Sequence, residues 1–462
     1  MNIKIIIIFW INLFLATIMV STSFASSVNK SSYENISYRS PINIIFDVHI
    51  EPMGTGPNYF QRRTEVNWLR ETAIKYGVKL SLQSNGEYME YCIENNHQSD
   101  FLKYINAGFD VGTHSHLVSH INTHQWVSHY NDELTFELVD KIISDAEFFV
   151  DAVVGPENNI GLCTQTNSQY LDEMMDKHDF MFITGPGEEG YFSFGHMVWN
   201  PFRPSTDEDY PMKENLDTNF ITIPHLPQIG KPNSHNMNLL LPQMKRRFIM
   251  IYLEWLNHER NNDDDKVWVW GWCTHPCQNL NHRQDIEEML RWLNENFIGK
   301  KSADGNTIAA YSTASEIYQQ YLDWENENPS VSMFSYIPGN PYPYTYEALP
   351  EILDEADYDS KINYGENLNI HKMIKNNTPM YIIWTDSGEE TIDFRDELFG
   401  KLKCTDGHGN VKYCLSKELT VSEEPLVVEF YSKYRNLQPN IGLLNKISTS
   451  SVFNIFLKIF NQ

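Results

Sequence analysis

The sequence predicts an α/β fold with a parallel sheet and crossover helices, followed by a small all-β domain. Apolar strand-like segments alternate with amphipathic helical segments at short spacing between residues 42 and 328. Polar side chains follow several of these strands, as in parallel sheets that carry a functional site. Between residues 329 and 440, short strands and turn residues predict a β-sandwich-like domain. The 462-residue chain is long enough for two domains.

The spacing of apolar residues places the elements of the first domain. Residues 42–50 form the first strand, and a helix over 64–76 ends at Gly77. Residues 185–235 are expected to be irregular, as loops that line functional sites often are. The other strands are predicted at 78–82, 109–111, 152–154, 180–184, 267–272 and 308–311, and the other helices at 101–107, 131–149, 168–178, 237–257, 283–297 and 315–324.

The first residues have the pattern of a signal peptide. Lys4 precedes an apolar run over 5–20, and Ser23-Phe24-Ala25 puts small residues where a signal peptidase reads. We expect cleavage after Ala25 and a secreted or periplasmic protein; an uncleaved membrane anchor is the alternative. Residues 26–41 then form a flexible lead-in, and residues 441–462 form a tail.

The net charge of the chain narrows the range of possible partners. The formal net charge of −26 repels nucleic acid and anionic lipid, so neither is an expected partner, and no other segment resembles a membrane span.

The cysteines suggest disulfide bonds, because an exported protein can form them. Cys404 and Cys414 flank a turn-rich segment, which favours a cross-strand bridge, whereas Cys273 and Cys277 form either a local bridge or two thiols.

Three histidines lie within seven residues, directly after the short strand that follows Gly108. His116 and His120 are four apart and would share one face of a helical turn. His114 and His116 are two apart and would point the same way along a continued strand. Either pair suits a metal ion, because imidazole is a common zinc ligand. The sequence leaves the choice between the pairs open.

Other polar residues occur at the ends of predicted strands. Asp47 and His49 interrupt an otherwise apolar strand and share one side of it, with Glu51 on the same side. His275 follows the strand over 267–272. Carboxyl ends of parallel strands meet at one edge, so we expect these residues and the three histidines to converge there.

These motifs resemble the polysaccharide deacetylase family of carbohydrate esterases, over residues 40–325. Phe46-Asp47-Val48-His49 matches the family's first motif, and Gly108-Phe-Asp-Val-Gly112 with His116-Leu-Val-Ser-His120 matches the second. Thr274-His275 and Tyr311-Ser-Thr-Ala-Ser-Glu-Ile317 match the closing motifs. The resemblance implies an irregular parallel (β/α) barrel that removes N-acetyl groups from a glycan with the help of a divalent metal, zinc by ligand type.

The resemblance also implies roles for individual residues. Asp47 would be the general base and His275 the general acid, with the metal held by two histidines and one residue of the first strand. Val48 replaces the family's second aspartate, so His49 or Glu51 must take its place, and the third motif lacks the family's arginine. The candidate metal ligands are His49, His114, His116 and His120, and the candidate substrate contacts are Glu157 and Trp272, the latter more typical of a core residue.

Two other functions are compatible with these residues. Val48 and the missing arginine favour a glycan-binding protein that has lost catalysis. A glycoside hydrolase would instead need two carboxylates about 5–10 Å apart and no metal.

Overall fold

The computed structural model describes residues 39–52, 58–164, 170–185, 199–205, 214–230, 238–257, 266–276, 280–331 and 346–431. The predicted signal peptide (1–25), most of the lead-in (26–41) and the tail (441–462) lie outside these residues. Among the described helices, none is long and apolar enough to cross a membrane.

The described residues up to 331 are built around a curled, all-parallel sheet, which confirms the predicted α/β class. The strands follow the order β10-β1-β2-β3-β6-β7-β8, and β9 pairs with β1. Leu226 lies just beyond β8, and its backbone N–H donates a hydrogen bond to the carbonyl of Gly271 in β9. Its own carbonyl accepts the N–H of Cys273, so these two bonds bring the ends of the sheet together. The strands are β1 (Ile42–Ile50), β2 (Leu80–Ser84), β3 (Asp110–Ser115), β6 (Asn159–Thr164), β7 (Phe182–Thr184), β8 (Ile221–Ile223), β9 (Trp268–Thr274) and β10 (Ala309–Tyr311).

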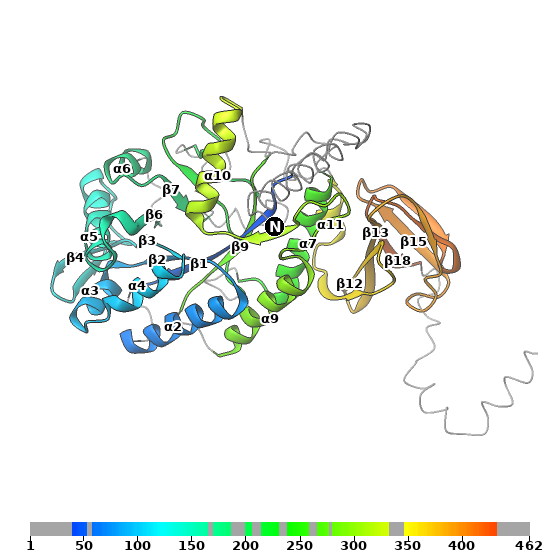
Figure 1. The fold of residues 1–462 in the computed structure, drawn as a ribbon, viewed down its shortest axis with the longest axis horizontal. Helices are drawn as coiled ribbons and strands as arrows, with labels where there is room; N and C mark the ends of the chain where they lie inside the picture. The colour runs from blue at the N-terminus through cyan, green and yellow to red at the C-terminus, as the bar shows by residue number, and fades with distance from the viewer. Residues whose placement is uncertain are drawn as a thin grey trace, which may run out of the picture. The chain divides into compact units, whose positions relative to one another are not determined.

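Helices cover both faces of this sheet (Figure 1). On one face, Ile44, Phe46 and Val48 of β1 share a core with α2 and α9. On the other, Ile45 packs in a cluster that includes Ile317 of α10. The helices are α2 (Tyr59–Tyr76), α3 (Gly86–Glu94), α4 (Gln98–Asn106), α5 (Phe136–Val154), α6 (Leu171–Lys177), α7 (Leu241–Leu256), α9 (Leu280–Asn296), α10 (Ala314–Glu327) and α11 (Leu349–Ile352).

The predicted strand over residues 152–154 is wrong. Helix α5 continues through Val154, which together with Val150 and Val153 lies in the core. Gly155 ends the helix in the left-handed region at φ 84°, and the strand begins only at Asn159. Short valine-rich segments fit a buried helix end as well as a strand, and here packing decides for the helix.

Several elements in the part of the chain before α11 were not predicted. Helix α3 lies between β2 and α4, strand β8 falls in the segment expected to be irregular, and a hairpin of β4 (Val118–Asn122) and β5 (Gln125–Ser128) follows the histidines. This hairpin is a separate two-stranded sheet. Its presence excludes the helical turn considered for His116 and His120.

The chain after α11 forms antiparallel sheets. A six-stranded sheet has the order β11-β12-β13-β18-β15-β16, and β14 pairs with β17. Side chains of both sheets share one core, and the opposite face contacts α7 and α9 through Tyr252 with Trp384 and Trp292 with Tyr358. Cys404 is bonded to Cys414, as predicted. The strands are β11 (Asp357–Ile362), β12 (Leu368–Lys375), β13 (Thr378–Thr385), β14 (Glu390–Ile392), β15 (Lys401–Asp406), β16 (Val411–Leu415), β17 (Leu419–Val421) and β18 (Leu426–Phe430).

Candidate metal and active site

The carboxyl end of β1 supplies three polar residues to one face of the sheet. Because side chains alternate along a strand, Asp47, His49 and Glu51 point to one side while Val48 points to the other. Val48 is fully buried in the core with the helices. Its side chain therefore lies on the wrong face to contribute to this site.

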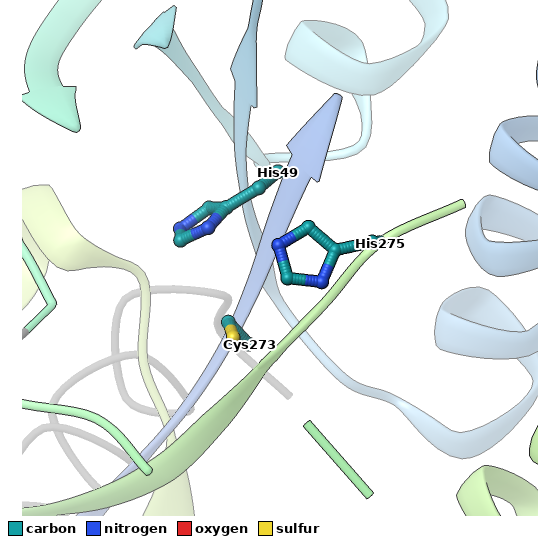
Figure 2. Close-up of side chains that lie close together, drawn as sticks. All are labelled: His49, Cys273 and His275. Carbon is teal, nitrogen blue, oxygen red and sulfur yellow. The ribbon is translucent and has the colours of Figure 1, made fainter. Parts of the chain in front are cut away.

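His49 lies at the centre of a group of imidazoles from other strand ends. Its ring stacks on that of His114 at a centroid distance of 4.8 Å and meets those of His225 and His275 edge-on at 5.4 and 5.5 Å. Figure 2 shows His49 on β1 beside His275 and Cys273, which come from the end of β9. The strand ends of β1, β3, β8 and β9 thus converge on one point.

Glu51 contacts three imidazoles at once. Its carboxylate lies 3.0 Å from His275 Nε2 and 3.5 Å from His114 Nε2, and it also contacts His116 Nε2. Burial alone would raise the pKa of Glu51, but its bonds with His114, His116 and His275 hold that pKa well below its ordinary value. Glu51 is therefore an ionised carboxylate placed among three imidazole rings.

Asp47 is fully buried beside His49. Its Oδ2 lies 3.0 Å from His49 Nε2 and 3.5 Å from His225 Nε2, and its Oδ1 accepts the Val48 N–H at 3.0 Å. Burial raises the pKa of Asp47, but His49, with a smaller effect from His225, outweighs it and lowers the pKa. Asp47 is thus an ionised carboxylate that orients the His49 ring.

Cys163, at the end of β6, lies beside the buried rings of His49 and His114. Its Sγ lies 4.0 Å from His49 Nδ1. Burial raises the pKa of the Cys163 thiol, but His49 and His114 lower it to about 7. Burial also opposes protonation of His114, yet Cys163 and Glu51 raise its pKa to about 9.

His275 is the most exposed ring of the cluster. About a quarter of its side chain is accessible, against 8% or less for His49, His114 and His116. Its Nδ1 lies 3.0 Å from Gln228 Oε1, so Nδ1 carries the proton of this bond. Burial lowers the pKa of His275 despite the opposing effect of Glu51.

The donor set fits a transition-metal ion. Glu51, His114 and His116 each offer one ligand atom, all within 4.8 Å of one another, and His49 forms similar groups with His114 and Cys163 and with Asp47 and His225. The ring of His114 is buried, and its Nε2 faces the Glu51 carboxylate at 3.5 Å, longer than an ordinary hydrogen bond. An imidazole and a carboxylate that face each other in this way could bind the same metal ion.

The structure does not bring all the predicted residues together. His120 lies on β4, with its Nε2 3.3 Å from Glu90 and its ring against Trp126 and Phe149. Glu157 is exposed at the amino end of β6, the edge opposite the site, because α5 is longer than predicted. Trp272 is fully buried against Phe46 and Trp270, so its ring offers no surface to a sugar.

Sequence reasoning missed two members of the cluster. His225 lies two residues after β8, in the segment expected to be irregular, and Cys163 lies in a strand that was predicted at other residues. The strand-like segment Phe220-Ile-Thr-Ile223 before Pro224-His225, and Ile160-Gly-Leu162 before Cys163, were the available signals. Both resemble the pattern that identified His275.

No family profile and no curated protein matches the chain. Solved structures do: a probable polysaccharide deacetylase from Pseudomonas aeruginosa PAO1 (9% identity, 63% of this chain, 93% of that chain, TM-score 0.39) and a family 4 carbohydrate esterase from Streptomyces lividans (10%, 58%, 97%, 0.27). A GH57-type branching enzyme from Pyrococcus horikoshii is also similar (8%, 61%, 70%, 0.35). Polysaccharide deacetylases are thus among the similar structures, but similarities this distant do not distinguish one function from another.

Proposed function

We propose that this protein is an exported, metal-dependent hydrolase that removes N-acetyl groups from a glycan. The observation that carries the proposal is the group formed by Glu51, His114 and His116 beside the Asp47–His49 pair and His275. Two imidazoles and one carboxylate are a common ligand set of hydrolytic zinc. The motif resemblance supplies the acetylated glycan as substrate class, and the signal-peptide pattern of residues 1–25 supplies export.

Each residue of the cluster has a proposed task. Glu51, His114 and His116 would hold the metal, which when bound polarises the acetyl carbonyl and lowers the pKa of a water molecule. The Asp47–His49 pair accepts the proton of the attacking water, because Asp47 orients His49 and stabilises its protonated ring. His275 is the ring with the most exposed edge, and it donates a proton to the departing amine.

The two carboxylates do not suit a glycoside hydrolase. Asp47 is fully buried under His49, and Glu51 is surrounded by three imidazoles. Asp47 cannot reach a glycosidic oxygen without displacing His49, and the oxygens of Glu51 already contact imidazole nitrogens. The geometry therefore favours metal-assisted hydrolysis over a two-carboxylate mechanism.

Acetate release from N-acetylglucosamine oligomers tests the proposal. We expect the protein to release acetate and a chelator to abolish the activity. Glu51→Gln keeps the shape but removes the anionic ligand, and it should lower kcat/KM by more than the ~100-fold that loss of an outer metal partner can cost. Glu157→Gln, at the opposite edge of the sheet, is the matched control and should retain full activity. Undiminished acetate release by Glu51→Gln or after chelation would refute the metal-dependent mechanism.

A further inference from the structure

A second group of metal-binding side chains lies between helix α3 and the β4–β5 hairpin. Glu90 of α3 is 5% exposed, and its Oε1 lies 3.3 Å from His120 Nε2. Its carboxylate also accepts the backbone N–H of His124 at 3.0 Å and the indole N–H of Trp126 at 2.9 Å. A buried carboxylate is thus positioned by the hairpin itself.

Glu94 and His124 lie on the outer side of the same group. Glu94 is one helical turn after Glu90, so both carboxylates are on one face of α3. The ring of His124 lies between them, with Nδ1 3.9 Å from Glu90 and Nε2 2.6 Å from Glu94, and it stacks on Tyr91 at 4.4 Å. His124 has a left-handed backbone at φ 59°, which histidine adopts several-fold more often than most residues.

We propose that Glu90, Glu94 and His124 form a second binding site for a divalent transition metal, zinc by ligand type. Glu90, Glu94 and His124 each offer a ligand atom within 4.8 Å of the others. His120 Nε2 lies 3.3 Å from Glu90 Oε1 and helps to position that carboxylate. Ligands of a tetrahedral zinc ion with bonds of ~2.0 Å lie ~3.3 Å apart, so the three groups would have to adjust only within the 4.8 Å that now separates their ligand atoms at most. The two carboxylates would balance the charge of one divalent ion.

A metal ion at this position would link the hairpin to α3 and hold it there. An isolated two-stranded hairpin is only marginally stable, and this one belongs to no larger sheet. It begins directly after His116, whose Nδ1 lies 2.6 Å from the hydroxyl of Tyr130 on the far side of the hairpin. Ordering the hairpin would therefore also order the segment that carries His116. Metal binding at this second site does not depend on the proposed deacetylase activity.

Metal counting on the full-length protein tests the proposal. We expect the zinc-saturated protein to hold two ions per chain after gel filtration, and Glu94→Gln and His124→Asn to hold one. The asparagine removes the imidazole but tolerates the left-handed backbone of residue 124. Zinc affinity at this site should fall at least ~10-fold in either variant. Glu133→Gln removes one exposed carboxylate near the hairpin and should still hold two ions.

The two metal sites can be separated by their variants. Glu51→Gln should lose one ion together with acetate release, whereas Glu94→Gln should lose the other ion and keep the activity. Zinc should raise the thermal midpoint of Glu51→Gln but not that of the double variant with Glu94→Gln. If Glu94→Gln and His124→Asn bind zinc with the stoichiometry and affinity of the unaltered protein, the second site is refuted, whatever the result at Glu51.

Discussion

Replacing Asp47 by asparagine tests how the base of the proposed reaction works. Asparagine has almost the same shape and can still accept the Val48 N–H at Oδ1. In place of Oδ2 it presents an amide N–H to His49 Nε2, now 3.0 Å from a carboxylate oxygen. The ring is then forced to accept at Nε2 and to carry its proton on Nδ1. The variant thus removes both the orienting charge and the tautomer that the base requires.

The expected fall in kcat/KM follows from the rate enhancement that a positioned general base supplies. Positioned general bases contribute ~10²–10⁴-fold, which corresponds to ~2.7–5.4 kcal/mol at 1.36 kcal/mol for each factor of ten. We therefore expect kcat/KM for acetate release to fall by ~10²–10⁴ in Asp47→Asn. The zinc count should stay unchanged, because the proposed ligands Glu51, His114 and His116 are retained.

Two results would contradict the role proposed for Asp47. If Asp47→Asn keeps kcat/KM within about threefold of the unaltered protein, the Asp47–His49 pair is not the base. If it loses one metal ion instead, Asp47 is a ligand, and the metal lies nearer His49 and His225 than we propose. Thermal unfolding should accompany the assay, so that a loss of folded protein is not mistaken for a loss of catalysis.

Two further predictions concern residues outside the proposed mechanism. His371 of β12 is buried, and burial and then Lys361 lower its pKa to about 3. The unfolded chain therefore binds the proton first as pH falls, and this residue should cost ~1.4 kcal/mol of stability per pH unit below about 6.5. Unfolding of His371→Gln at pH 7 and pH 5 should show a flatter dependence, and an unchanged slope would contradict the assignment. Trp272→Ala should lose ~3–5 kcal/mol of stability, because the ring is fully buried. Trp272→Phe should leave KM unchanged, and a tenfold rise in KM without loss of stability would restore Trp272 as a substrate contact.

Local sequence patterns were enough to predict which side chains of β1 face the site. The apolar run over 42–50 predicts β1, and the two-residue period of a strand assigns Asp47, His49 and Glu51 to the face opposite Val48. This reasoning needs no information about distant residues. The convergence of these side chains with His114, His116 and His275 was also predictable, because carboxyl ends of parallel strands share an edge.

Only the tertiary structure decided which other residues join them. His120 turns to Glu90 because a hairpin follows His116, and Glu157 lies at the far edge because α5 runs on to Val154. His225 reaches His49 because Leu226 bonds to β9 and brings the ends of the sheet together. Sheet closure and helix length depend on packing between residues far apart in the chain, whereas strand alternation depends only on neighbours. The sequence by itself therefore determined which face each β1 side chain takes, and long-range packing determined which residues complete the site.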